Sequence, residues 1–213
     1  MAHAPKETKD CAGRPKDPHK RSAILASARA QFLANGFERA GMDAIASGAG
    51  VSKLTVYSHF GSKEALFTQV IEAQCSALSL SGDYSDLLAM SPREGLMHIA
   101  QQFIALVFRP ESINMHRIML AEAGTKPMMS RLFYEAGPQP VKRSFAQYLA
   151  KMTEQKKLNV EEPERATHYF FNLLKGEPHF RALLNLGDMP TRPALDAHVK
   201  DVVEMFLRAY RAD

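Results

Sequence analysis

The chain has 213 residues, of which 46% are hydrophobic and 23% are charged. This length supports one large domain or two small ones with a substantial core. No apolar run reaches the ~18–20 residues of a membrane-spanning helix, and no apolar signal-peptide core follows the charged N-terminus. Since Cys11 and Cys75 are the two cysteines, a disulfide framework is excluded and we expect a reduced, cytoplasmic protein with no membrane association.

The basic residues are concentrated near the N-terminus. Residues 1–63 contain ten Lys and Arg against five Asp and Glu, whereas residues 64–213 contain 17 against 18. A basic field at one end of a chain indicates a polyanionic partner, most often nucleic acid. The alternative is a basic tail that only increases solubility.

Helical patterns begin after a charged segment that is rich in Pro and Gly. Residues 1–17 have almost nothing to bury and predict a flexible arm. Apolar residues at helical spacing then predict four helices. They run from about residue 18 to Asn35-Gly36, from 42 to 47, from 52 to His59 and from 62 to 81.

Longer helical segments follow in the second half. Ser91-Pro92-Arg93-Glu94 is a capping box with Pro at the first helical position, a strong helix start. Because no stretch alternates with a period of two, the predicted fold class is all-α. The helices expected here, separated by Gly and Pro, are 91–108, 112–123, 127–136, 139–157, 164–175, 178–186 and 193–211.

The segment MDAIASGAGVSKLTVYSHF, residues 42–60, carries the clearest functional pattern. Two short helices that cross at a steep angle need a small residue at the crossing, here Ala46, and a left-handed turn residue, here Gly50. Val51 is the apolar residue beneath the turn, Ser52 can cap the second helix, and Val56 faces inward. Together they predict a helix-turn-helix whose second helix enters the DNA major groove.

Residues 20–70 closely resemble the DNA-binding domain of the tetracycline-repressor (TetR-like) family of transcriptional regulators. The resemblance is carried by Gly36-Phe37, Ile45-Ala46, Gly50-Val51-Ser52, Tyr57, Phe60 and Ser62-Lys63-Glu64. The rest of the chain is similar in length and helical style to the ligand-binding, dimerising domain of that family. The resemblance implies a three-helix DNA-binding domain at 18–63 and a larger helical effector-binding and dimerisation domain at 64–213.

The resemblance places the recognition helix at 52–59. The DNA-binding residues that it implies are Ser52, Lys53, Leu54, Thr55, Tyr57, His59 and Lys63. Lys53, Leu54 and Thr55 are expected at base edges, and the others near phosphates or at the helix start. Three alternatives stay open: Tyr57 as a packing aromatic, His59 as a solvated side chain, and Leu54 without a contact.

The sequence departs from the family pattern at Ala40-Gly41, where relatives usually have Thr followed by Ser or Thr. Gly41 can still begin the helix through its backbone, but the side-chain cap and its phosphate contact are lost.

In the arm, Gly13-Arg14-Pro15-Lys16 resembles the short basic cores that lie in A·T-rich minor grooves. A plain flexible tail is the alternative.

The C-terminal part is rich in Met and Phe, which adapt to apolar ligands, so we expect a pocket for a small hydrophobic or aromatic effector. Core packing is the alternative for each residue. The candidate pocket residues are Phe103, Met115, His116, Met119, Phe133, Phe145, Tyr148, His168, Phe171 and Asn172.

The last two strong helices, near 164–175 and 193–211, are expected to form a homodimer interface, as the resemblance implies. An apolar face of the final helix comprises Leu195, Val199, Val202, Val203, Phe206, Leu207 and Tyr210. A monomer could instead bury this face internally. Two-fold symmetry would place two recognition helices ~34–36 Å apart on DNA.

Enzymatic and metal-binding motifs are missing from the sequence. The eight His are scattered, and no His-Glu-x-x-His, Gly-x-Ser-x-Gly or phosphate-loop pattern occurs. We therefore predict no catalytic residues, no metal and no cofactor. The expected function is a ligand-responsive DNA-binding regulator, a repressor that a small hydrophobic effector releases from a palindromic operator. The alternatives are an architectural DNA-binding protein and a helical carrier or enzyme that retains a DNA-binding domain.

Overall fold

The computed structural model describes residues 17–76 and 84–212, and within these ranges it consists of α-helices joined by short loops. This confirms the all-α prediction. Residues 1–16, which include the expected basic arm, and the expected helix end near residue 81 lie outside the described residues. No helix in the described parts of the chain is long and apolar enough to cross a membrane.

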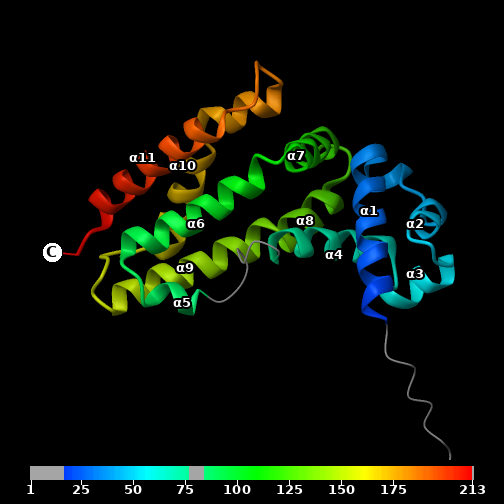
Figure 1. Ribbon diagram of the computed structural model, residues 1–213, viewed down its shortest axis with the longest axis horizontal. Helices are drawn as coiled ribbons and strands as arrows, with labels where there is room; N and C mark the ends of the chain where they lie inside the picture. The colour runs from blue at the N-terminus through cyan, green and yellow to red at the C-terminus, as the bar shows by residue number, and fades with distance from the viewer. Residues whose placement is uncertain (1–16, 77–83, 213) are drawn as a thin grey trace, which may run out of the picture.

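Three N-terminal helices form a compact unit at one end of an elongated molecule, here called the head (Figure 1). Its members are α1 (Pro18–Arg39), α2 (Met42–Gly48) and α3 (Lys53–Phe60). The helical pattern of α1 is interrupted at Gly36, whose φ of 70° and ψ of 174° are non-helical. The break is where the sequence predicted the helix to stop, and one further helical turn follows it.

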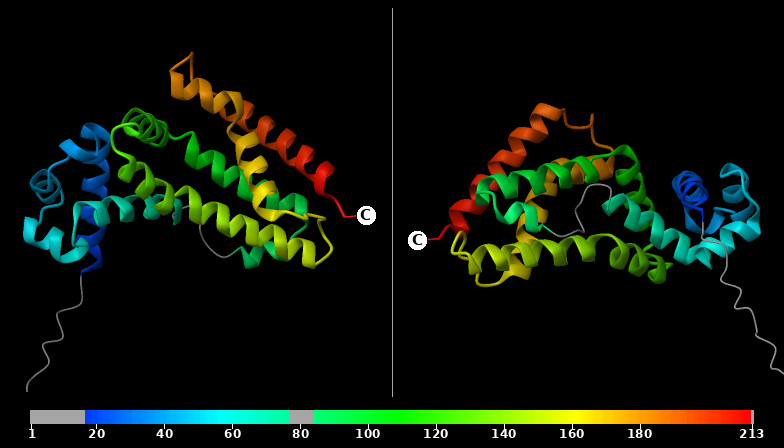
Figure 2. Two further views of the ribbon diagram at one scale, coloured as in Figure 1. Left: turned by 180° about the vertical axis from the view of Figure 1, so that it is seen from behind. Right: turned by 60° about the horizontal axis from the view of Figure 1, so that its bottom comes forward.

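The remaining helices form the body, which extends away from the head (Figures 1 and 2). They are α4 (Lys63–Ser76), α5 (Ser85–Leu88), α6 (Pro92–Val107), α7 (Pro110–Glu122), α8 (Pro127–Ala136), α9 (Pro138–Glu154), α10 (Pro163–Leu184) and α11 (Arg192–Tyr210). Each helix from α6 to α11 has Pro in its first turn, where the missing N–H has no helical partner to lose. The capping box at Ser91 is present as predicted, with Ser91 Oγ accepting from the Glu94 N–H.

The segments expected as separate helices at 164–175 and 178–186 both lie within α10, and a break at Gly176 (φ 47°, ψ −159°), two residues before Pro178, separates them where the sequence predicted. One element of the body differs from the prediction. The short helix α5 was not predicted. With four residues it has too few positions to establish a helical period.

The body has its own apolar core, built around stacked aromatic side chains. Phe145 of α9 lies 4.7 Å from Phe170 of α10 between ring centroids, and Phe170 lies 4.9 Å from Phe206 of α11. All three side chains are buried. A second core in the head continues beyond residue 63, because Met115 and Met119 of α7 pack with the apolar residues of α1–α4.

The apolar face of α11 that we considered for the dimer interface is used inside the protomer. Leu195, Val199, Val202, Val203 and Phe206 are all buried, and Leu207 and Tyr210 pack against the same core. In this core they join buried residues of α6, such as Leu96 and Ile99. The expectation that this face meets a second subunit is therefore wrong, and the internal alternative holds. The helical period shows that a face is buried, but it does not show which element covers it.

Candidate nucleic-acid interface and cavity of the body

The turn between α2 and α3 has the geometry that the sequence predicted. Gly50 adopts a φ of 65°, in the left-handed region that favours Gly. The Val51 N–H donates to the Ala46 carbonyl at 3.0 Å, which closes the turn across the buried Ala46 methyl. Val56 of α3 is fully buried. The turn and this apolar anchor hold α3 at the end of the molecule with its opposite face in solvent.

Ser52 caps α3, as predicted. Its Oγ accepts a hydrogen bond from the Thr55 backbone N–H at 3.1 Å and lies 2.8 Å from Thr55 Oγ1. The cap satisfies one of the backbone donors that a helix start leaves unpaired. The Thr55 side chain is thereby held at the first turn of α3, half-buried beside an exposed Ser52.

The outer face of α3 presents a mixed set of side chains. Leu54 is 79% exposed and Tyr57 is 41% exposed, so both side chains are available to a partner. Lys53 is exposed and pairs with Asp43 of α2, Nζ to Oδ2 2.9 Å. His59 is half-buried, and its ring lies 6.1 Å from that of Phe60.

Lys63 has internal partners in addition to its expected position near DNA. Its Nζ donates to the Glu38 carbonyl at 2.8 Å and lies 4.7 Å from the Phe37 ring centroid. These contacts join the start of α4 to the end of α1. Ser62 caps α4 by accepting from the Ala65 N–H at 3.0 Å. Gly41 begins α2 without a side-chain cap, in agreement with the departure noted in the sequence.

One structural requirement of the head was missed from the sequence. Ser27 Oγ donates to the Ile45 carbonyl at 2.8 Å and fastens α1 to α2. A Cβ on Gly48 would lie 2.5 Å from the same Ser27 Oγ, so this position requires Gly for packing. A Gly inside the pattern of a short helix was the available signal, because such a Gly often has a packing reason.

The body contains a cavity of about 270 Å³ that is partly open to solvent, close to the lower end of the ~300–1,000 Å³ range of small-molecule sites. Helices α4 and α6–α10 all contribute to its wall. Five of the predicted pocket residues line it: Phe103, Met115, His116, Phe133 and Phe171. The structure thus brings together half of the predicted set around one space.

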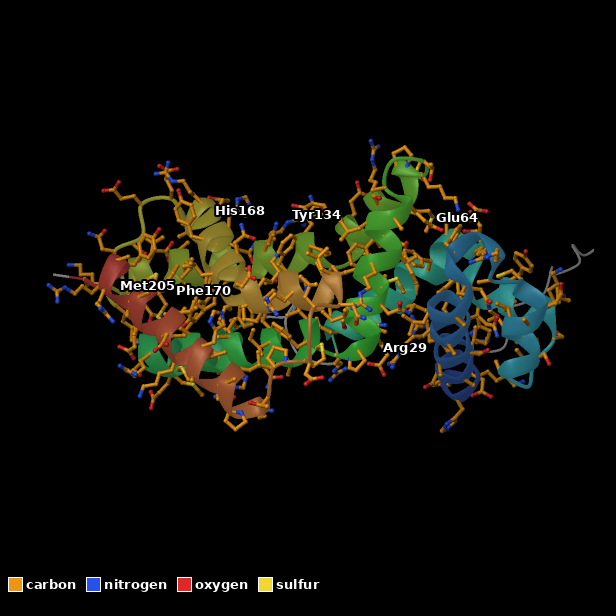
Figure 3. The ribbon with its side chains drawn as sticks, turned by 90° about the horizontal axis from the view of Figure 1, so that it is seen from above. Arg29, Glu64, Tyr134, His168, Phe170 and Met205 are labelled. Atoms are coloured by element: carbon orange, nitrogen blue, oxygen red, sulfur yellow. The ribbon has the colours of Figure 1, made fainter. Side chains whose placement is uncertain are left out.

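The other five predicted pocket residues do not line this cavity. Met119 lies in the core of the head, and Phe145 and Tyr148 lie in the core of the body. His168 and Asn172 are exposed on α10, and Figure 3 shows His168 at the same edge of the molecule as Tyr134. Residue type alone selected these positions, and Met or Phe fills cores and pockets equally well.

Polar groups of the cavity wall were largely missed from the sequence. They are Gln74 of α4, Ser112 of α7, Tyr134 of α8, Lys142 of α9 and Lys175 of α10. The Ser112 carbonyl accepts from His116 Nδ1 at 2.7 Å, which orients the imidazole. Burial lowers the pKa of His116 and favours its neutral form. The helical periodicity offered one signal, since Lys175 follows the buried Phe171 by one turn.

Helix α7 connects the cavity with the head. While Ser112, Met115 and His116 face the cavity, Asn114 Nδ2 donates to the Leu33 carbonyl of α1 at 3.1 Å. Arg29 of α1 pairs with Glu111 at 3.4 Å, and Figure 3 shows Arg29 where α1 meets the body.

Two further contacts extend these connections. Arg117 of α7 donates to the Leu183 carbonyl near the C-terminal end of α10 at 2.9 Å. Ile71, Gln74 and Cys75 of α4 also border the cavity, and α4 packs along α1. Helices α4 and α7 therefore both connect the wall of the cavity with the head.

Comparisons with known proteins agree with this architecture. Residues 24–70 match the family of bacterial regulatory proteins named tetR, and residues 94–212 match the C-terminal domain of AefR-like transcriptional repressors. The chain is also 43% identical over 58 residues to the HTH-type transcriptional activator FasR of Mycolicibacterium smegmatis. That match spans 27% of this chain and 26% of the activator.

Solved structures cover nearly the whole chain. A TetR-family transcriptional regulator from Mesorhizobium loti is 29% identical with a TM-score of 0.75, covering 91% of this chain and 97% of its own. The flavonoid-responsive regulator FrrA is 34% identical with a TM-score of 0.71, covering 92% and 98%. These relatives are transcriptional regulators and not enzymes. The chain belongs to the TetR family and is a DNA-binding transcriptional regulator with an N-terminal helix-turn-helix.

Proposed function

We propose that this protein is a homodimeric repressor that leaves a palindromic operator when a small aromatic effector occupies the cavity in its body. The observation that carries this proposal is the position of the cavity. Its wall includes α4 and α7, the two helices that also contact α1 of the head. The match of residues 94–212 to a repressor domain supports repression, and the flavonoid response of the 34%-identical relative supports an aromatic effector.

In this proposal α3 lies in the major groove. Lys53, Leu54 and Thr55 face base edges, since the first turn of α3 leaves them at the end of the molecule. Lys53 reaches purine acceptors, and Leu54 or the Thr55 methyl suits a thymine methyl group. Tyr57, His59 and the capped start of α4 near Lys63 contact phosphates.

The dimer interface in this proposal is the outer face of α10 and α11. Tyr169 and Leu173 are 52% and 38% exposed one helical turn apart on α10, and Phe180 and Leu184 are 57% and 53% exposed beyond the break at Gly176. Met205 on α11 is 53% exposed. Figure 1 shows α11 along the outer edge of the body, with α10 beside it. Exposed apolar rows of this kind mark protein interfaces.

The effector acts by preferring one arrangement of the two heads. If it binds the DNA-free arrangement about 100-fold more tightly, it weakens operator binding by the same factor, about 2.7 kcal/mol. A ligand that binds both arrangements equally shifts nothing. Because its target is DNA, we place the protein in the bacterial cytoplasm.

The first experiment is selection of binding sites from random DNA duplexes with the purified protein. Enrichment of an inverted repeat supports a dimeric, sequence-specific regulator. Lys53→Ala and Thr55→Val variants are then expected to change the preferred half-site and leave its spacing intact. Binding without enrichment that fades with salt would refute the proposal and favour an architectural DNA-binding protein.

Repression and effector response are then measured on the enriched site. A reporter gene placed behind that site is expected to be silenced by the regulator. A reporter that the protein activates would overturn repression. Effector release is measured as a loss of operator affinity when an aromatic compound is added, with Tyr169→Glu as a monomeric control that tests the dimer face.

A further inference from the structure

Two lysines from different helices border the cavity. Lys142 of α9 and Lys175 of α10 both line its wall. Within residues 17–76 and 84–212, neither ammonium forms an ion pair or a hydrogen bond, while Lys142 Nζ lies 5.3 Å from the Tyr134 ring centroid. Both side chains are half-buried. A positive charge in such a position is costly unless an anion compensates it.

The other groups at the cavity do not supply that negative charge. The described wall contains no Asp or Glu, and its remaining titratable groups are His116, Tyr134 and Cys75. Burial and the positive charge of Lys142 lower the pKa of Lys175, and burial raises the pKa of the Cys75 thiol to about 11. At neutral pH the thiol is uncharged, so the two lysines dominate the field inside the cavity.

The rest of the wall is apolar and rich in aromatic rings. The Phe103 and Phe171 rings lie 4.5 Å apart between centroids, at 47° to one another. The Phe133 ring meets His116 edge to face at 5.4 Å. Rings arranged in this way offer both faces and edges to a flat guest. One side of the cavity is therefore suited to an aromatic body, and the lysine pair is suited to an anionic group attached to it.

We infer that the effector is an aromatic organic anion, whose carboxylate or phenolate is held by Lys175 and Lys142 and whose ring lies among Phe103, Phe133 and Phe171. This inference rests on the proposed function, because it names the ligand class of the proposed effector cavity. It adds a requirement for negative charge, which neither residue composition nor the size of the cavity implies. A hydrogen bond between an ammonium and an anion is roughly twice as strong as one between neutral groups.

The test compares matched pairs of probes that differ in charge at nearly constant shape. The pairs are 2-naphthoate with 2-naphthamide and biphenyl-4-carboxylate with biphenyl-4-carboxamide, titrated calorimetrically into the full-length protein at pH 7.5. In at least one pair the acid is expected to bind about tenfold or more tightly than its amide. Lys175→Met is expected to remove this preference, with Lys142→Met reducing it.

Lys151→Met is the matched control, since Lys151 is an exposed lysine of the same α9 that does not border the cavity. This variant is expected to keep the preference for the acids. Lys175→Met is also expected to raise the melting temperature of the ligand-free protein, because it removes an uncompensated charge from a half-buried site. A higher melting temperature with weaker acid binding would identify Lys175 as a binding residue and not a structural one.

The outcomes separate this inference from the proposed function. If the amides bind as tightly as the acids, or if Lys175→Met and Lys142→Met leave acid binding intact, the inference of an anionic effector is overturned. The proposal that the cavity binds an effector would then still hold. Failure of both acids and both amides to bind would also overturn the inference. The proposed DNA-binding function is judged separately, by the selected operator and by its affinity in the absence of any probe.

Discussion

The ion pair between Lys53 and Asp43 provides a sharp test of how α3 meets DNA. The pair joins the first turn of α3 to the first turn of α2 at 2.9 Å, and both side chains are largely exposed. In the proposed complex Asp43 competes with DNA for the Lys53 ammonium. The Asp43→Asn variant removes that competitor and a negative charge near the phosphates. We expect tighter DNA binding with little change in the melting temperature.

The size of the effect follows from counting one cationic contact. Each B-DNA phosphate that a lysine neutralises releases about 0.9 counterion, so the slope of log affinity against log salt becomes steeper by up to ~0.9, the limit at which the Lys53 ammonium in the groove also neutralises one phosphate charge. Over a threefold increase in salt, from 0.1 to 0.3 M, the advantage of Asp43→Asn over wild type shrinks by up to about 2.7-fold. Fluorescence anisotropy with an operator duplex at five salt concentrations measures both slopes.

Two controls isolate the contact. Asp196→Asn breaks a comparable exposed pair with Arg192, at 3.0 Å on α11 in the body, and is expected to leave the salt slope unchanged. In a Lys53→Ala background, Asp43→Asn is expected to lose most of its effect, since the released ammonium is absent. An unchanged or shallower slope for Asp43→Asn alone would refute the reasoning and remove Lys53 from the proposed DNA contacts.

Three further predictions concern stability and coupling. Ser52→Ala removes the cap of α3 and is expected to cost about 1 kcal/mol in the free energy of unfolding, measured by urea denaturation; Ser52→Asp keeps the cap, and equal losses for both would contradict its role. Burial, followed by the charges of His116 and Lys175, lowers the pKa of His179 to about 4. The unfolded chain therefore binds more protons than the folded chain between pH 4 and 6.5. As the pH falls from 6.5 to 4, protonation of His179 lowers the free energy of unfolding by at most about 1.4 kcal/mol per pH unit. Calorimetry is expected to show a smaller fall in His179→Leu, and an identical fall would exclude His179 as its source. Asn114→Ala breaks the hydrogen bond from α7 to the Leu33 carbonyl, so more effector should be needed to release operator; Asn159→Ala, in the loop before α10, is the control, and matching release curves would discount the α7 route.

The helix-turn-helix could be predicted from the sequence because its determinants are local. The left-handed turn at Gly50, the cap at Ser52 and the inward Val56 lie within seven residues, and each has a backbone or burial requirement that only a few residue types meet. The capping box at Ser91 and the Pro residues that begin α6–α11 are local in the same sense. Such signals do not depend on which distant segment packs against them.

The tertiary structure decided which surface each amphipathic helix covers. The apolar face of α11 was evident from its period, but its burial against α6 depends on a segment about a hundred residues earlier in the chain. The same holds for Gly48, whose requirement for Gly comes from Ser27 on another helix. The helical period of apolar residues predicts that a face is buried. Only the packing of whole helices shows which other helix covers that face.

The cavity shows the same division most clearly. Sequence composition predicted an apolar, aromatic pocket in the C-terminal part, and Phe103, Phe133 and Phe171 do line one. It did not separate them from Phe145, because identical side chains fill cores and pockets. The lysines of the wall were missed, since a lysine on a helical surface is ordinarily solvated. Only the convergence of α9 and α10 places Lys142 and Lys175 beside one apolar space, where their positive charges favour the binding of an anion.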